Sequence, residues 1–328
     1  MRKIVVTFEA DESQRKMFEN TFPSHELSFL VDCRGTHDKE SVLKTADVLI
    51  SWNPTNELKG IDPHSLGNVR FVQLISAGYD HLKLEMFPET CAIAANQGAY
   101  ALPMAEHVLA MILSRAKRLR KYHDMLAEGR FEQRNATTKR VTGSTLGVVG
   151  FGSIGKETVR LMRPFNVKVL ALNSTGRTDE RVDFCGTLRD LDRVLTDSDF
   201  VVISIPLSNE TEGLIGKREL AKMRGDAVLV NVARGPIVRE KDLYEHLKSH
   251  PDFSACIDAW WIEPFKHGKF GVDYPFFELP NLLGSPHNSA LVDGIMLEGA
   301  TRAAGNAMRY LNGEKVAGMI PGSQAISV

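Results

Sequence analysis

One ten-residue stretch constrains the fold of this chain more than any other. Residues 146–155 read LGVVGFGSIG, an apolar run leading into glycines spaced as GxGxxG and then into a helical pattern. Gly150 permits a tight turn, Gly152 allows another group to approach the backbone, and Gly155 lets the helix pack closely on the strand. A further apolar run, residues 167–172, follows at the distance expected of the next strand. The segment therefore predicts a strand–turn–helix–strand unit of a doubly wound sheet.

The same turn predicts a bound dinucleotide. Unpaired N–H groups and the dipole at a helix N-terminus favour a diphosphate. The expected contacts at the turn are Gly150, Gly152, Ser153, Ile154 and Gly155.

The end of the next strand bears on the choice of cofactor. An NAD-specific site usually carries Asp or Glu there, to accept hydrogen bonds from the adenosine ribose. This chain has Asn173, Ser174, Thr175, Gly176 and Arg177 in that place. Without a carboxylate a 2′-phosphate meets no repulsion, and Arg177 can pair with it. The sequence favours NADP over NAD, with an NAD site built on a relaxed loop as the alternative.

Short apolar runs alternate with helical patterns along most of the chain, which indicates an α/β fold with parallel sheets. Five candidate strands precede residue 100, and six more begin at Leu146. A helical pattern after the last strand, roughly residues 291–311, is too short for a domain and is expected to pack on the N-terminal sheet. We predict two doubly wound domains. A Rossmann-type nucleotide domain (101–288) is inserted into a smaller flavodoxin-like substrate domain (1–100 and 289–328).

A long helical pattern joins the two series of strands. It starts after Pro103, and Gly129 is a natural stop. One continuous apolar face is expected along it, formed by Val108, Met111, Ile112, Leu119, Tyr122 and Leu126. This stripe is either ordinary core or a dimer surface, and we expect a homodimer.

Composition excludes several classes of protein. Hydrophobic residues make up 43% and charged residues 25% of the chain, the mixture of a soluble globular protein. The formal charge of −1 gives no reason to expect nucleic acid or a membrane surface as partner. The four cysteines form no CxxC pair, so we expect a reducing, intracellular setting with no disulfide framework and no zinc site. We also expect a cytoplasmic location and no metal. No apolar stretch approaches the roughly 20 residues that a membrane span needs.

Three polar segments follow successive predicted strands in the second half. They contain Arg234 in NVARGP, Glu263 in DAWWIEP and His287 in SPHNSA. Each segment lies at the carboxyl end of a strand, where doubly wound folds place their ligands. Alone, each residue is as well explained by an ordinary loop or a surface ion pair. Together they bring a cation, a carboxylate and an imidazole to one crevice.

With these segments the chain closely resembles the D-isomer-specific 2-hydroxyacid dehydrogenase family over nearly its whole length. The resemblance includes SAGYD at 76–80, NQG at 96–98, the glycine turn and PLS at 206–208. It implies that Arg234 binds substrate, that His287 is the general acid/base and that Glu263 is its partner. Ser76, Ala77 and Gly78 are expected at the substrate carboxylate. Further cofactor contacts are expected from Pro206, Thr211, Val232, Ala233, Asp258 on the nicotinamide side, and Ala290.

The chemistry agrees with these residue types. Reduction of a small 2-keto acid to a D-2-hydroxy acid places hydride on C2, and negative charge develops on the oxygen of the C2 carbonyl. His287 can donate a proton to that oxygen. Glu263 favours the charged imidazole, and Arg234 holds the carboxylate through its fork of donors. Ser204 stands where family members often have histidine. The segment 265–277 looks longer than usual and, with Trp260 and Trp261, is expected to shape the pocket wall.

Two alternative functions are compatible with the sequence. Related dehydrogenases act on formate or phosphite, but Glu263 argues against the formate branch. A nucleotide-sensing binding protein or corepressor on the same fold can retain Arg234, Glu263 and His287. Oxidation of a reduced nicotinamide cofactor on adding a 2-keto acid separates an enzyme from such a protein.

Overall fold

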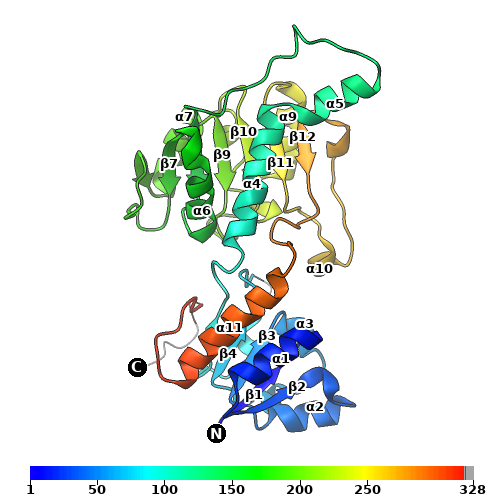
Figure 1. The fold of residues 1–328 in the computed structure, drawn as a ribbon, viewed down its shortest axis with the longest axis vertical. Helices are drawn as coiled ribbons and strands as arrows, with labels where there is room; N and C mark the ends of the chain where they lie inside the picture. The colour runs from blue at the N-terminus through cyan, green and yellow to red at the C-terminus, as the bar shows by residue number, and fades with distance from the viewer. Residues whose placement is uncertain (81, 321, 323–328) are drawn as a thin grey trace. The chain divides into compact units, whose positions relative to one another are not determined.

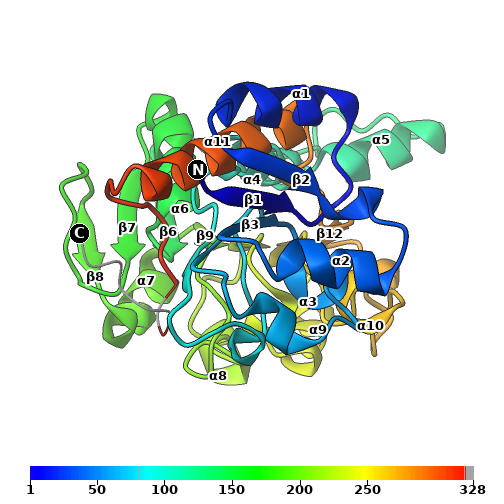
Figure 2. The same cartoon turned by 90° about the horizontal axis from the view of Figure 1, so that it is seen from below.

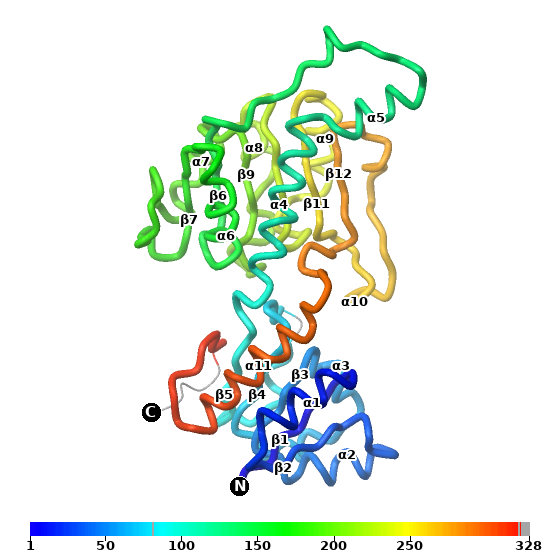
Figure 3. The backbone as a smooth tube through the Cα atoms, in the orientation of Figure 1, coloured from blue at the N-terminus to red at the C-terminus, as the bar shows by residue number. Residues whose placement is uncertain are grey.

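The computed structural model describes residues 1–80, 82–320 and 322. The chain forms two compact units, a terminal unit (Met1–Tyr100 with Val292–Val328) and a central unit (Ala101–Leu291). The chain runs from one unit into the other and returns, as the tube in Figure 3 shows. Each unit has one parallel sheet covered by helices (Figure 1), so the predicted α/β fold class is confirmed.

The terminal unit has a five-stranded parallel sheet in the order β2-β1-β3-β4-β5. This is the flavodoxin-like order, in which the chain reverses direction across the sheet between β1 and β3. The strands are β1 (Lys3–Val6), β2 (Glu26–Phe29), β3 (Val48–Ser51), β4 (Phe71–Leu74) and β5 (Ala92–Ala94).

Helices cover both faces of this sheet because its strands alternate between two cores. Val6 packs in one core with Phe18 of α1 (Glu12–Thr21) and Ala303 of α11 (Ile295–Leu311). Val5 packs in the other core with Leu43 of α2 (Thr36–Leu43), on the side that also carries α3 (Pro54–Glu57; Figure 2). The C-terminal helix α11 contacts α1, β3 and β4, as predicted from its sequence.

The central unit has a seven-stranded parallel sheet in the order β12-β11-β10-β9-β6-β7-β8. The order reverses between β6 and β9, the position at which doubly wound sheets bind dinucleotides. Six strands were predicted; the additional strand, β8, is short and lies at the sheet edge beside β7. The strands are β6 (Thr145–Val149), β7 (Lys168–Leu172), β8 (Phe184–Gly186), β9 (Phe200–Ile203), β10 (Val228–Asn231), β11 (Ser254–Ile257) and β12 (Leu282–Gly284).

Two helical layers bury this sheet. On one face α4 (Ala101–Ala116) and α6 (Ser153–Met162) pack through residues such as Met111 and Met162. The other face is covered by α7 (Leu191–Asp197), α8 (Lys217–Leu220) and α9 (Glu240–Ser249). None of the described helices is long and apolar enough to cross a membrane.

The predicted long helix is wrong in its second half. It breaks at Arg118, whose φ of 51° is left-handed, so that α5 (Leu119–Ala127) is a separate helix. Val108 and Ile112 are buried in α4, but Leu119 and Leu126 are 58% and 54% exposed. The periodicity of the apolar residues did not reveal the break, because it registers spacing along the chain and not a change of direction.

Candidate active site

The glycine turn after β6 has the backbone that only glycine adopts easily. Gly150 has a φ of +103°, and a Cβ there would lie 2.5 Å from the backbone nitrogen of Ile205. The N–H groups of Gly150 and Phe151 both donate to the carbonyl of Leu172 at the end of β7, at 3.0 and 2.7 Å. Ser204, the departure from the family pattern, donates from Oγ to the Gly150 carbonyl at 2.8 Å. The turn is therefore held from both neighbouring strands.

The start of α6 fits the diphosphate of a dinucleotide. The helix begins at Ser153 with Gly152 as its N-cap, and within the described residues no side chain caps it. A Cβ on Gly152 would meet no described atom within 4 Å. The first N–H groups of α6, from Ser153 and Ile154 onward, are thus approachable, and a helix N-terminus favours an anion.

The loop after β7 is organised by Asn173. Its Oδ1 accepts hydrogen bonds from the N–H groups of Thr175 (3.1 Å) and Gly176 (2.7 Å), and its Nδ2 donates to the carbonyl of Arg177 (2.7 Å). No carboxylate stands at the strand end, and Arg177 lies on an exposed loop. The Asn173 side chain holds the loop, which the sequence did not reveal.

The other expected cofactor residues lie on loops after β9, β10 and β12. Thr211 is buried, donates from Oγ1 to the Pro206 carbonyl at 2.7 Å and accepts from the Ser208 N–H at 2.8 Å. Its hydroxyl therefore shapes the loop after β9. Val232 and Ala233 are also buried, whereas Ala290 is half-buried.

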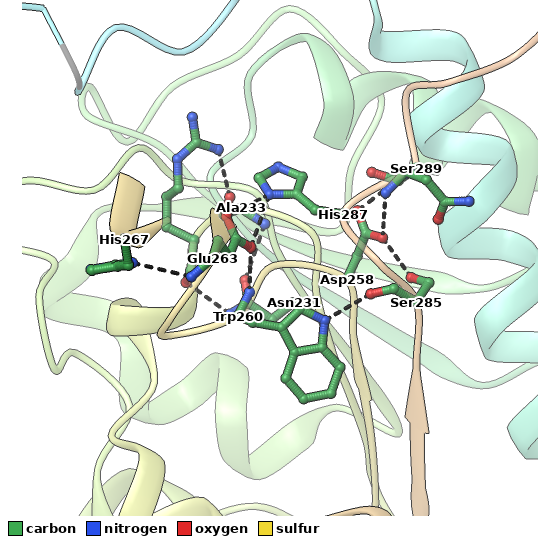
Figure 4. A network of polar contacts seen from close by, with 11 residues as sticks. Asn231, Ala233, Asp258, Trp260, Glu263, His267, Ser285, His287 and Ser289 are labelled. Carbon is green, nitrogen blue, oxygen red and sulfur yellow. Dashed lines mark hydrogen bonds and ion pairs between the residues drawn. The ribbon is translucent and has the colours of Figure 1, made fainter. Parts of the chain in front are cut away.

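The turn that carries Arg234 is built by buried Asn231 at the end of β10. Its Nδ2 donates to the Arg234 carbonyl at 2.9 Å, and its Oδ1 accepts from the Ala233 N–H at 3.1 Å (Figure 4). A Cβ on the next residue, Gly235, would lie 2.3 Å from the carbonyl carbon of Trp260. Glycine at 235 thus permits close approach of the loops after β10 and β11. The Arg234 guanidinium donates from Nη1 to the Ala233 carbonyl at 2.7 Å.

Glu263 and His287 form a close pair. The Nδ1 atom of His287 lies 2.9 Å from both carboxylate oxygens of Glu263 (Figure 4). Glu263 is only 5% exposed, and its Oε1 also accepts a hydrogen bond from the Trp260 N–H at 2.6 Å. The backbone N–H of Glu263 donates to Nδ1 of His267 at 3.1 Å. The carboxylate is thus fixed from several sides, and Nε2 is the imidazole nitrogen left outside the contact.

Asp258 anchors the loop on which His287 stands. Its side chain is fully buried and accepts from Ser285 Oγ (2.5 Å), the Asn288 N–H (3.1 Å) and the Ser289 N–H (3.2 Å). Its carbonyl accepts from the His287 N–H at 2.9 Å. His287 itself has a left-handed φ of 52°, an uncommon conformation for a residue other than glycine. The Asp258 side chain thus holds this loop, and its Oδ1 atom also lies 3.8 Å from Nε2 of His107.

The expected substrate-binding residues Ser76, Ala77 and Gly78 belong to the terminal unit, where they form a bend after β4 and are partly exposed. The Ser76 Oγ atom is buried and has no hydrogen-bond partner among the described residues.

One histidine pair in the sequence has a spacing used by metal sites, HxxxH at 246 and 250. The two rings stack with their centroids 4.0 Å apart, and burial lowers the pKa of His246 to about 4. Across the described part of the chain, no group of three or more His, Cys, Asp or Glu residues is placed to hold a metal.

A glycine turn at the switch point of a doubly wound sheet defines a dinucleotide-binding protein, and comparison with known proteins gives its family. The family model for the NAD-binding domain of D-isomer specific 2-hydroxyacid dehydrogenases matches residues 109–289, more than half of the chain. The chain belongs to the D-isomer specific 2-hydroxyacid dehydrogenase family.

Three proteins illustrate the similarity. Glyoxylate/hydroxypyruvate reductase B of Enterobacter sp. (strain 638) is 30% identical over 75% of this chain and 76% of its own length. A glycerate dehydrogenase related protein from Thermoplasma acidophilum has a solved structure that is 27% identical, with a TM-score of 0.67 over 94% of this chain and 99% of that one. D-3-phosphoglycerate dehydrogenase of Methanocaldococcus jannaschii is 26% identical over 96% of this chain. The chain spans only 58% of that enzyme and 42% of a second archaeal D-3-phosphoglycerate dehydrogenase.

Proposed function

We propose that the protein reduces a 2-keto acid to a D-2-hydroxy acid with a nicotinamide cofactor. The observation that carries this proposal is the contact of His287 Nδ1 with the buried Glu263 carboxylate, 2.9 Å to each oxygen. An imidazole held by a carboxylate at one nitrogen is oriented to exchange a proton at the other. Family membership and the glycine turn supply the remaining support.

Each residue of this site has a separate task. The bound nicotinamide supplies the hydride, and the glycine turn with the start of α6 would hold its diphosphate. His287 donates a proton from Nε2 to the oxygen of the substrate carbonyl, while Glu263 stabilises the charged imidazole. Arg234, whose turn is fixed by Asn231, binds the substrate carboxylate and stabilises the negative charge that develops on the oxygen. Ser76, Ala77 and Gly78 are proposed to offer further polar groups to that carboxylate.

A direct assay tests the activity. Purified protein with NADPH or NADH should oxidise the cofactor when glyoxylate, hydroxypyruvate or another 2-keto acid is added, and chiral analysis should find the D product. Cofactor binding without turnover across such a panel would instead identify a nucleotide-sensing protein.

For the cofactor we propose a preference for NADPH. The loop after β7 presents Arg177 and no carboxylate at its start, and Asn173 fixes its backbone through three hydrogen bonds. Within the described residues the Arg177 guanidinium makes no ion pair, which leaves it able to meet a 2′-phosphate.

Replacing Arg177 by alanine should weaken the preference for NADPH. A charge-assisted contact to the phosphate is worth about 1.5–3 kcal/mol, so the ratio of kcat/KM for NADPH over NADH should fall roughly 10–150-fold. Asn173→Asp should lower the ratio too, because a carboxylate repels the phosphate. It can still accept from Thr175 and Gly176, but it loses the donation to the Arg177 carbonyl. The ratio is measured at fixed salt, with Lys248→Ala on α9 as control. A wild-type preference for NADH contradicts the proposal. An unchanged ratio in Arg177→Ala would point to Arg181 instead.

We further propose a homodimer formed through α5 and the chain that follows it. This part projects from the sheet of the central unit (Figure 1), and Leu119, Leu126 and Phe131 on it are 58%, 54% and 78% exposed. A second copy would cover these side chains. Light scattering should give twice the 36.4 kDa of one chain, and Leu126→Glu with Phe131→Glu should give the single mass. A wild-type monomer at assay concentration would refute the dimer.

A further inference from the structure

A phenylalanine ring stands beside the imidazole of His287. Phe265 lies on the four-residue helix α10 (Pro264–His267), and its ring centroid is 5.9 Å from that of His287 with the planes at 71°. The helix is tied down at its start and end. The Glu263 N–H donates to His267 Nδ1 at 3.1 Å, and the His267 and Gly268 N–H groups donate to the carbonyls of Glu263 and Pro264, both at 2.8 Å. The turn that positions Glu263 therefore also positions this ring.

Core packing does not account for a phenylalanine at 265. The side chain is 50% exposed, whereas Phe276 of the same segment is completely buried in the core. Full burial of a phenylalanine side chain contributes favourable free energy, and an exposed ring forgoes much of that contribution. A ring that is half-exposed in the protein alone gains this free energy when an apolar group of a ligand covers it.

The place of the ring indicates which part of a ligand would cover it. The carbonyl oxygen that His287 protonates must come within hydrogen-bond reach of Nε2, since Nδ1 is engaged by Glu263. The proposed partner of the substrate carboxylate is Arg234. The one remaining substituent on C2 is the side chain of the 2-keto acid, and Phe265 is an apolar side chain whose ring contacts the imidazole.

We infer that Phe265 binds the side chain of the substrate, and that the preferred substrates are 2-keto acids with an apolar, aromatic or branched side chain. This inference rests on the proposed function and specifies its substrate class. The neighbouring Lys266 and Lys269 are exposed and would suit an anionic side chain instead, but it is the ring of Phe265 that contacts the imidazole.

The chain supplies a matched control for this ring. Phe270 is 51% exposed and lies on the same segment, but its ring contacts Trp260 and Phe277, with centroids 5.6 and 6.2 Å away. Phe270→Ala removes a phenylalanine ring that is about as exposed as that of Phe265 but packs on Trp260 and Phe277 and not on His287. A difference between the two variants therefore reports the position of Phe265.

The test compares phenylpyruvate, 4-methyl-2-oxopentanoate and glyoxylate as substrates of the wild type, Phe265→Ala and Phe270→Ala. The wild type should show a higher kcat/KM for the two apolar substrates than for glyoxylate. In Phe265→Ala the value for phenylpyruvate should fall roughly 10–200-fold, the range for lost contacts in an apolar pocket. The value for glyoxylate should change less than about twofold. In Phe270→Ala the ratio of kcat/KM for phenylpyruvate over glyoxylate should stay within about twofold of the wild-type ratio, whatever the effect on overall activity.

Several results would overturn the inference. An equal loss on all three substrates with a displaced pH profile would show that Phe265 acts through His287 and not on the substrate. Oxaloacetate is assayed beside these substrates because its side chain is anionic, and a preference for it would favour Lys266 and Lys269 over Phe265. An unchanged kcat/KM for phenylpyruvate in Phe265→Ala would show that the ring does not contact the substrate.

The inference is also testable without turnover. Calorimetry with the cofactor-loaded protein compares phenylacetate with acetate, and Phe265→Ala should abolish the tighter binding of phenylacetate. If no 2-keto acid is reduced, the proposed activity is wrong, and the calorimetric comparison then tests by itself whether Phe265 contacts the side chain of a bound acid. Equal binding of both acids to the wild type would then overturn the contact.

Discussion

Replacing His287 by alanine is expected to lower kcat for 2-keto acid reduction by ~10²–10⁴-fold, the usual contribution of a general acid. Cofactor affinity should remain within about twofold, because the glycine turn after β6 makes no use of this side chain. The loss follows from the imidazole alone: Glu263 holds Nδ1 at 2.9 Å and leaves Nε2 for the substrate. Steady-state kinetics and calorimetric titration with NADPH measure the two quantities.

The backbone at 287 requires a second variant. His287 has a φ of 52°, and alanine adopts this conformation less readily than asparagine does. His287→Asn keeps a side chain suited to the left-handed backbone but removes the proton donor, so it should lose activity to the same extent. Exposed His37 on α2, replaced by alanine, controls for loss of a histidine elsewhere. Near-wild-type kcat in His287→Asn would exclude proton donation by this residue.

The positions of the glycine turn and of the three candidate catalytic residues could be predicted from the sequence, because short local patterns determine them. The GxGxxG turn predicts its own strand and helix, and Arg234, Glu263 and His287 each follow an apolar run that had to be a strand. Parallel strands end at one edge of their sheet, so residues after β10, β11 and β12 meet without further information. The pairing of Glu263 with His287 is the clearest outcome of this rule.

The hydrogen bonds that hold these residues in place could not be predicted from the sequence, because they depend on backbone donors and on burial. The backbone N–H of Trp260 donates to Glu263, but nearly every residue has such a group, so no sequence pattern identifies this contact. The Nδ1 contact of His267 depends on the four-residue helix α10, and the Ser204 contact on the approach of two loops. Asp258 was placed on the nicotinamide side by resemblance, while its burial and its three hydrogen-bond donors emerge only from the fold.

Asp258→Ala should destabilise the protein strongly. The substitution removes an acceptor from Ser285 Oγ and from the N–H groups of Asn288 and Ser289, and two of these donors belong to buried or half-buried backbone. A buried donor left without its acceptor costs about 1–3 kcal/mol, so the loss of an acceptor shared by three donors should cost about 3–5 kcal/mol in all. For a unit of this size that corresponds to a fall in Tm of roughly 6–20 °C. Differential scanning calorimetry measures the fall.

A milder substitution distinguishes the contributions of the two carboxylate oxygens of Asp258 to stability. Asp258→Asn keeps one oxygen for Ser285 and Asn288 but places an amide NH₂ against the Ser289 N–H, so we expect a loss of about 1–3 kcal/mol. Exposed Asp252, which pairs with Arg118 at 3.4 Å on the surface, is the control, and its removal should cost at most about 1 kcal/mol.

The same variants show whether Asp258 acts through the position of His287. The backbone N–H of His287 donates to the Asp258 carbonyl, and both substitutions retain this bond. The flanking residues Ser285 and Asn288 keep their acceptor in Asp258→Asn and lose it in Asp258→Ala. If the side chain positions the imidazole, kcat should fall in the order wild type, Asp258→Asn, Asp258→Ala, with KM for the cofactor nearly unchanged. This order should persist at a temperature where all three proteins are folded. An Asp258→Ala protein with wild-type Tm and kcat would show that the loop after β12 is held by other contacts, and that the buried carboxylate has no positioning role.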